Sequence, residues 1–107
     1  MSIAIWNRMK GLLARRLRTL DRKRPFVVKA VDERGLTLLL ESTGKERVVP
    51  RSEIESTFKD LWVRSEISRA EIRERHSKAH PAYVAALLAE LPEVGVKLKP
   101  IRLYRLQ

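Results

Sequence analysis

Apolar residues recur at helical spacing through the first 21 positions of the chain. They follow one another at intervals of three and four, and most positions between them are polar or basic. The members of this stripe are Trp6, Met9, Leu13, Leu17 and Leu20. Such spacing places the side chains on one face of a helix. The pattern predicts an amphipathic helix over residues 3–21 with a basic opposite face.

Short apolar runs separated by turn residues occupy the next stretch. The runs cover residues 26–31, 36–41 and 46–49, and Gly35 and Gly44 lie in the turns between them. Glycine in a short turn between two β-rich runs is typical of hairpins. We therefore expect a three-stranded antiparallel β-meander over residues 26–50.

Three helix start signals follow within about thirty residues. Ser52-x-x-Glu55 and Ser68-x-x-Glu71 have the spacing of capping boxes, in which serine and glutamate satisfy free backbone N–H groups. His80-Pro81 is a third start, because proline suits the first helical position. The expected helices cover residues 53–64, 69–76 and 81–91.

The tail alternates apolar and basic residues over 96–106, as a half-buried strand does, and the alternation slips at Pro100. The predicted fold class is α+β: an N-terminal amphipathic helix, a three-stranded antiparallel β-meander, a three-helix helix-turn-helix-like core and a C-terminal strand. We expect a basic helical arm over residues 1–24 and a single α+β domain over 25–107. Within that domain the meander covers 26–50, the tri-helical core 51–92 and the strand 96–106.

Charge is concentrated at the N-terminus. The 107 residues carry a net charge of +10, of which residues 1–25, with eight basic residues against Asp21 alone, contribute +7. Such a field attracts polyanions, with nucleic acid first, an anionic membrane second and an acidic protein third. No run approaches the roughly 20 apolar residues that span a bilayer, and no signal peptide is apparent. We expect a cytoplasmic protein.

Catalytic and metal-binding patterns are absent from the sequence. There is no cysteine, and His76 and His80 lack the glutamate that a metalloprotease helix places between two histidines four residues apart. The carboxylates fall mostly on expected turns, caps and exposed faces. We therefore predict no enzymatic activity, no cofactor and no metal.

Residues 51–106 resemble a winged helix-turn-helix domain. The resemblance rests on Ser68-x-x-Glu71, the turn at 77–80, the helix from Pro81 and the strand from Val96. It implies that the third helix enters the major groove and that the strand region touches the DNA backbone. This third helix, however, offers mainly alanines and Glu90 outward, so contacts to phosphates are expected to outweigh contacts to base edges.

The predicted function is therefore non-enzymatic nucleic-acid binding, with DNA ahead of RNA, through a basic arm and a winged-helix-like domain. The candidate contact residues are Arg8, Lys10, Arg15, Arg16, Arg18, Arg22, Lys23, Arg24, Arg69, Arg73, Lys78, His80, Tyr83, Lys97, Lys99 and Arg102.

An alternative is a small basic adaptor subunit that docks a partner protein through the apolar stripe of Trp6, Met9, Leu13, Leu17 and Leu20. Such a subunit could belong to a mobile-element, defence or anti-defence system. The alanine-rich third helix could also form a homodimer interface. The sequence leaves open whether the stripe packs on its own domain, on a partner or beside nucleic acid.

Overall fold

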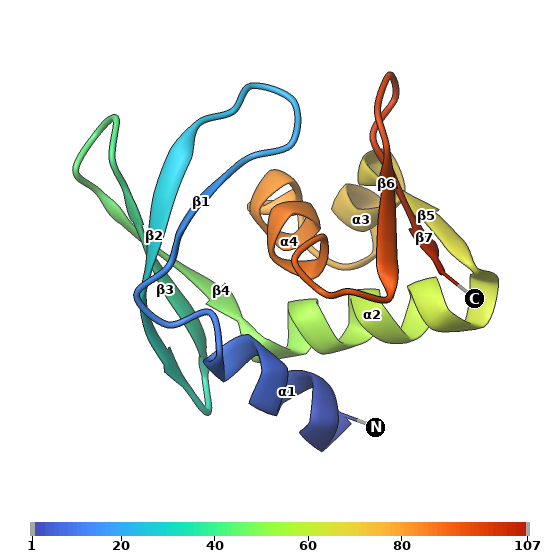
Figure 1. Ribbon diagram of the computed structural model, residues 1–107, viewed down its shortest axis with the longest axis horizontal. Coiled ribbons are helices and arrows are strands. Elements are labelled where there is room, and N and C mark those ends of the chain that lie inside the picture. The colour runs from blue at the N-terminus through green and yellow to red at the C-terminus, as the bar shows by residue number, and fades with distance from the viewer. Residues whose placement is uncertain (1, 107) are drawn as a thin grey trace.

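The computed structural model describes residues 2–106, which form an α+β fold with two antiparallel sheets (Figure 1). The helices are α1 (Ser2–Lys10), α2 (Arg51–Arg64), α3 (Arg69–Arg75) and α4 (Pro81–Leu88). The first sheet contains, in spatial order, β1 (Arg16–Arg18), β2 (Pro25–Asp32), β3 (Gly35–Leu40) and β4 (Glu46–Pro50). The second sheet contains, in spatial order, β5 (Glu66–Ser68), β7 (Arg102–Arg105) and β6 (Val94–Lys97). The predicted α+β class is confirmed.

The predicted helix over residues 3–21 is wrong beyond its first half. Helix α1 ends at Lys10, immediately before Gly11, and the chain then turns and enters β1. Glycine weakens a helix by about 1 kcal/mol relative to alanine. Past this point the chain gains hydrogen bonds from β2 instead: Ala14 N donates to Val28 O at 2.7 Å and Val28 N to Arg15 O at 3.0 Å. Sheet pairing thus overrides the helical spacing.

The meander has four strands rather than the predicted three. The three expected runs form β2, β3 and β4, and β1 joins the free edge of β2. Gly35 sits where β3 meets the end of β4, and a Cβ built there would lie 2.1 Å from Val49 O. The predicted boundary between residues 24 and 25 falls between two paired strands, so the described part of residues 1–24 belongs to the same folded body.

Two of the three predicted helix starts are confirmed. Ser68 accepts from Glu71 N at 3.1 Å and donates its own N–H to Glu71 Oε1 at 3.0 Å, which completes the capping box of α3. Pro81 opens α4, as predicted, although α4 ends at Leu88 rather than Leu91. Ser52 is not a cap, because α2 already begins at Arg51 behind Pro50.

The predicted C-terminal strand over residues 96–106 is two strands. Residues 94–97 form β6, the chain turns through residues 98–101, and β7 returns antiparallel to it. Pro100 lies in that turn, since a proline cannot donate a hydrogen bond to a strand ladder. The expected connection after α2 is also a strand, β5, which pairs with β7.

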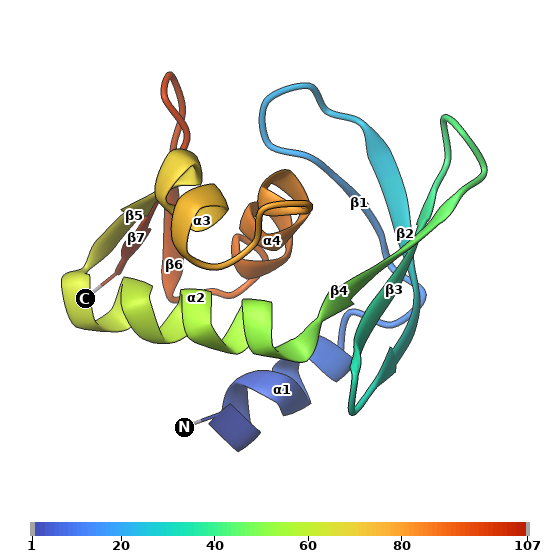
Figure 2. The same ribbon diagram turned by 180° about the vertical axis from the view of Figure 1, so that it is seen from behind.

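Helix α4 lies between the two sheets, with α2 crossing beneath it and α1 beside the start of α2 (Figures 1 and 2). Residues 84–88 of α4 are all buried, and they share one continuous core with residues of α1, of both sheets and of α2. The ring of Phe26, on β2, meets the ring of Tyr83, on α4. The two short sheets and the helices that pack against them therefore enclose a single core.

Candidate nucleic-acid interface

Three predicted contact residues in the N-terminal segment are held by carboxylates of other elements. These ion pairs are Arg8–Glu93, Arg15–Glu90 and Arg16–Glu41. Hydrogen bonds from Arg8 hold the pKa of the Glu93 carboxyl below its ordinary value, although its burial opposes this shift. The pairs attach the N-terminal segment to the rest of the fold, so a phosphate would have to compete with a carboxylate for these arginines.

Two more predicted contact residues share one carboxylate on the second sheet. Glu66 accepts from Arg102 Nη1 at 2.7 Å and from Lys97 Nζ at 3.4 Å. The hydrogen bond from Arg102, assisted by that from Lys97, lowers the pKa of Glu66. Lys97 also lies 5.2 Å from the ring centroid of Tyr104. About half of the predicted positive charge of this sheet is therefore neutralised within the fold.

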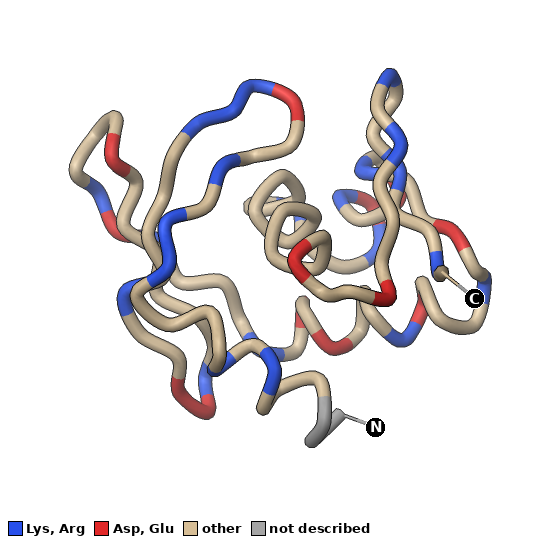
Figure 3. Tube along the Cα trace, in the orientation of Figure 1, with Lys and Arg blue, Asp and Glu red and all other residues tan. Residues whose placement is uncertain are grey.

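Apart from Arg69, the other predicted lysines and arginines have no carboxylate within ion-pair distance among residues 2–106. They are Lys10, Arg18, Arg22, Lys23, Arg24, Arg73, Lys78 and Lys99. Arg22, Lys23 and Arg24 lie on the loop between β1 and β2, and Lys99 lies in the β6–β7 turn. This loop and this turn point to the same end of the molecule, on either side of α3 (Figures 1 and 3). We call this region the basic end.

The β1–β2 loop has a defined shape. Thr19 N donates to Arg24 O at 3.1 Å, and Arg24 N donates to Thr19 Oγ1 at 3.0 Å, so the loop is closed at its base. Arg18 Nη1 donates to Lys23 O at 3.2 Å and fastens the far side of the loop. Thr19 is 3% exposed and anchors the loop in the core. The exposed arginines of the loop are thus presented from a hydrogen-bonded support.

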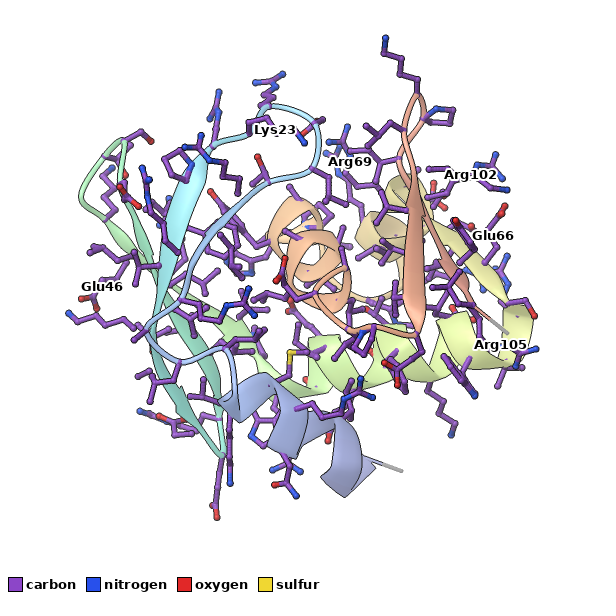
Figure 4. The ribbon with its side chains drawn as sticks, in the orientation of Figure 1. Lys23, Glu46, Glu66, Arg69, Arg102 and Arg105 are labelled. Atoms are coloured by element: carbon purple, nitrogen blue, oxygen red, sulfur yellow. The ribbon has the colours of Figure 1, made fainter. Side chains whose placement is uncertain are left out.

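Arg69, the first residue of α3, connects the loop to the second sheet. Its backbone N–H donates to Ile101 O at 3.0 Å, and its guanidinium forms an ion pair with Asp21 on the loop. Figure 4 shows Arg69 between Lys23 and the β6–β7 hairpin. A cleft of about 220 Å³ opens beside this ion pair. Its lining residues are Thr19, Asp21, Arg22, Arg24, Arg69, Ala82 and Tyr83.

The carboxyl of Asp21 is held in its charged form at this cleft. Burial acts to raise its pKa, but hydrogen bonds from Arg69 and from the Arg22 N–H outweigh burial and lower it. The Arg22 N–H donates to Asp21 Oδ1 at 2.7 Å. The loop therefore carries one anionic group that competes with any incoming anion for Arg69.

Arg73 and Lys78 lie apart from this cleft. Both line a second hollow of about 390 Å³ at the turn between α3 and α4, together with Glu53 and Glu74. Lys10 lies at the end of α1, near the start of α2 and away from the basic end (Figure 1). The structure therefore brings together only part of the predicted contact set.

Helix α4 does not present a long outward face. Ala85 is 1% exposed and Ala86 2% exposed, so two of the alanines that were expected outward lie in the core. His80, its N-cap residue, is largely enclosed, and the buried Nδ1 lies 3.7 Å from Glu53 Oε1 without a hydrogen bond. Tyr83 is partly buried against Phe26 and also lines the cleft. A helix enclosed in this way cannot lie along a DNA groove.

The apolar stripe predicted to dock a partner is mostly part of the core. Trp6, Met9 and Leu17 are buried, Leu20 packs against the core, and Leu13 alone of the five is exposed. The guanidinium carbon of Arg51 lies 5.0 Å from the centroid of the Trp6 ring and covers it. The question that the sequence left open is answered: the stripe packs on its own fold. The stripe is not a free docking surface, because the turn after Gly11 folds it inward.

A hydrogen-bonded set of Ser56, His76 and Asp60 was not anticipated from the sequence. His76 Nδ1 lies 2.9 Å from Ser56 Oγ, and His76 Nε2 lies 2.8 Å from Asp60 Oδ2. Ser56 and Asp60 are four residues apart on α2, a spacing that places them on one helix face, but nothing local marks His76 as their partner. Asp60 also pairs with Arg64 and Arg75. These hydrogen bonds therefore hold α2 against the C-terminal end of α3.

Comparison of the chain with models of protein families, with curated proteins and with solved structures finds no match. Within residues 2–106, no three His, Asp or Glu side chains come close enough to hold a metal ion. No helix in the described part of the chain is long and apolar enough to cross a bilayer.

Proposed function

We propose that this protein binds nucleic acid without catalysing a reaction, with DNA ahead of RNA, mainly through phosphate contacts made at its basic end. The observation that carries the proposal is that Arg22, Lys23 and Arg24 stand without carboxylate partners, within residues 2–106, on a preformed loop. Elsewhere many basic side chains are paired. Exposed cations without partners can release the counterions that phosphates hold, which is the main source of affinity in sequence-independent binding.

The order of elements in the second half supports a winged-helix-like reading. The chain runs α2, β5, α3, α4, β6, β7, and the sheet order is β5-β7-β6, so a tri-helical unit is followed by a β-hairpin. In this proposal the β6–β7 hairpin is the wing and its turn brings Lys99 to the basic end. The enclosed α4 disfavours base reading, so we propose binding with little sequence preference. A cytoplasmic location stays part of the proposal.

The test is fluorescence anisotropy of the full chain with labelled duplex DNA, single-stranded DNA and RNA across a salt series. We expect the affinity for duplexes of unrelated sequence to be similar and to fall steeply with salt. The variant Arg22→Gln/Lys23→Gln should bind more weakly, with the slope of log affinity against log salt reduced by about 2 if each cation contacts one phosphate.

The matched control is Arg34→Gln/Lys59→Gln. It removes the same charge from the β2–β3 turn and from α2, which lie at the end of the molecule opposite the basic end (Figure 1). Equal loss in both variants would mean that net charge, and not the basic end, attracts nucleic acid. Absence of binding by the unaltered chain at low salt would overturn the proposal.

A further inference from the structure

The cleft beside Arg69 is built from three separate parts of the fold. The β1–β2 loop supplies Asp21, Arg22 and Arg24, α3 supplies Arg69, and α4 supplies Ala82 and Tyr83. Three arginines, Arg22, Arg24 and Arg69, are among the residues that line one hollow of about 220 Å³. Figure 4 shows the loop that carries Lys23 reaching toward Arg69. An anion that enters this cleft meets cations from two elements.

The local charge distinguishes between kinds of phosphate. Arg22, Arg24 and Arg69 against Asp21 give the cleft a net charge of +2. A phosphate diester within a strand carries a single negative charge, whereas a phosphate monoester carries about −1.5 to −2 near neutral pH. Planar guanidinium groups also bind phosphate oxygens in pairs of hydrogen bonds, and a monoester offers three such oxygens.

We propose that this cleft binds the terminal phosphate monoester of a nucleic-acid strand. The proposal rests on the nucleic-acid-binding function above and gives it a preference for phosphorylated ends. The monoester enters beside Arg69, in the place where the carboxylate of Asp21 now pairs with Arg69. The strand then leaves the cleft toward the remaining cations of the basic end.

The support of the cleft is already in place before a ligand binds. The hydrogen bonds between Thr19 and Arg24 fix the base of the loop, and the bond from Arg69 N to Ile101 O fixes the start of α3. Little ordering of the backbone is therefore required on binding, and a preorganised backbone loses less entropy when it closes on a ligand. The cleft is also lined by Ala82 and Tyr83, which lie in the first turn of α4. Backbone N–H groups in a first helical turn have no carbonyl partner within the helix, so they can donate to an oxygen of a ligand.

Substitution of Asp21 tests the proposal, because the direction of the change in affinity can be predicted. Its carboxylate occupies Arg69, so Asp21→Asn should raise the affinity for a phosphorylated end more than the affinity for an unphosphorylated one. The matched control is Glu33→Gln, which removes one negative charge from the exposed β2–β3 turn. That control should change the affinities for phosphorylated and unphosphorylated ends by the same factor, because it alters only the long-range electrostatic potential and no group in the cleft.

The experiment compares oligonucleotides of one sequence that carry a 5′-phosphate, a 3′-phosphate or hydroxyls at both ends, with inorganic phosphate as competitor. We expect one phosphorylated form to bind the unaltered chain about tenfold or more tightly than the hydroxyl form, which is the effect of one charge-assisted hydrogen bond. The variants Arg69→Gln and Arg22→Gln should each reduce this preference, and Arg34→Gln should leave it intact. Arg22 is exposed, so its variant tests the cleft even if Arg69→Gln impairs folding.

The outcomes separate this inference from the function on which it rests. Binding of all three oligonucleotides with equal affinity would overturn the terminal-phosphate site and leave nucleic-acid binding standing. A preference that persists unchanged in Arg22→Gln and Arg69→Gln would place the phosphate elsewhere and overturn the assignment of the cleft. Failure of every oligonucleotide to bind would overturn both proposals.

Discussion

The ring of Tyr83 lies edge-on against the ring of Phe26, with the two centroids 5.2 Å apart and the ring planes at 90°. Phe26 is fully buried on β2, and Tyr83 belongs to α4. An edge-to-face pair contributes about 0.5–1.5 kcal/mol beyond the area that it buries. This contact joins the first sheet to the helix at the centre of the molecule.

Replacing Phe26 with alanine should therefore destabilise the whole fold. We expect Phe26→Ala to lower the free energy of unfolding by about 3–5 kcal/mol, as loss of a buried phenylalanine does. Tyr83→Phe keeps the ring pair and should lie within about 0.5 kcal/mol of the unaltered chain. Denaturant-induced unfolding followed by circular dichroism measures both. Equal stability of the three proteins would show that the ring pair does not hold the sheet to α4.

The two serine–glutamate motifs predict different outcomes for the same substitution. Ser68 caps α3, whereas Ser52 lies exposed in the first turn of α2. Ser68→Ala should lower the unfolding free energy by about 0.5–2 kcal/mol, which is the usual effect of losing an N-cap. Ser52→Ala should change it by less than about 0.5 kcal/mol. Matched urea titrations would contradict the structure if both serines proved equally important.

Glu71 should make the fold sensitive to acid. Its hydrogen bond from Ser68 N, reinforced by Arg64, lowers the pKa of its carboxyl from 4.5 to about 2. Because the folded-state pKa lies below the unfolded one, the stabilisation is complete above pH 4.5 and is lost as the pH falls toward 2. In Glu71→Gln this part of the pH dependence disappears. Thermal unfolding midpoints between pH 6 and pH 2 test this, and parallel curves for the two proteins would argue against it.

Removal of residues 1–24 should unfold the chain rather than shorten an arm. The segment contributes five buried apolar side chains: Ile5, Trp6, Met9, Leu12 and Leu17. At about 1.5–3 kcal/mol for each buried side chain, their loss is comparable to the entire stability of a small domain, about 5–15 kcal/mol. Circular dichroism and gel filtration of the shortened chain would report the loss of structure. A cooperative unfolding transition retained after truncation would contradict this role.

The sequence predicted those elements whose signals are local. The capping box at Ser68, the proline at the start of α4 and the glycine turn between β2 and β3 each depend on residues close together in the chain. The helix through residue 21 failed because the pairing of β1 with β2 depends on partners that lie beyond an intervening loop, as in the pair of Arg16 with Val27. Leucine and arginine fit either a helix or a strand, so spacing alone could not decide between them.

The sequence predicted that basic residues would form the candidate site, but it did not predict where in the fold they would meet. Charge placement identified Arg22, Arg24 and Arg69 as candidates but could not bring them to one cleft, since only the fold sets the β1–β2 loop beside α3. Charge placement also could not exclude Arg8 from the candidate residues, although Arg8 forms an ion pair with Glu93, which lies 85 residues away in the sequence. Ion pairs between distant segments leave no pattern in the sequence, and they decide which cations stay free.

The enclosure of α4 has a consequence for how this fold can be divided. A fragment of residues 51–106 would keep three helices and a hairpin in the order of a self-contained unit. It would lose Phe26 and the other core residues that the first sheet and α1 contribute. The apolar side chains of α4 that the first sheet now covers would be exposed to solvent in the fragment, and we expect the fragment to aggregate. Neither half keeps a complete core on its own, so the chain is expected to be expressed and engineered only as a whole.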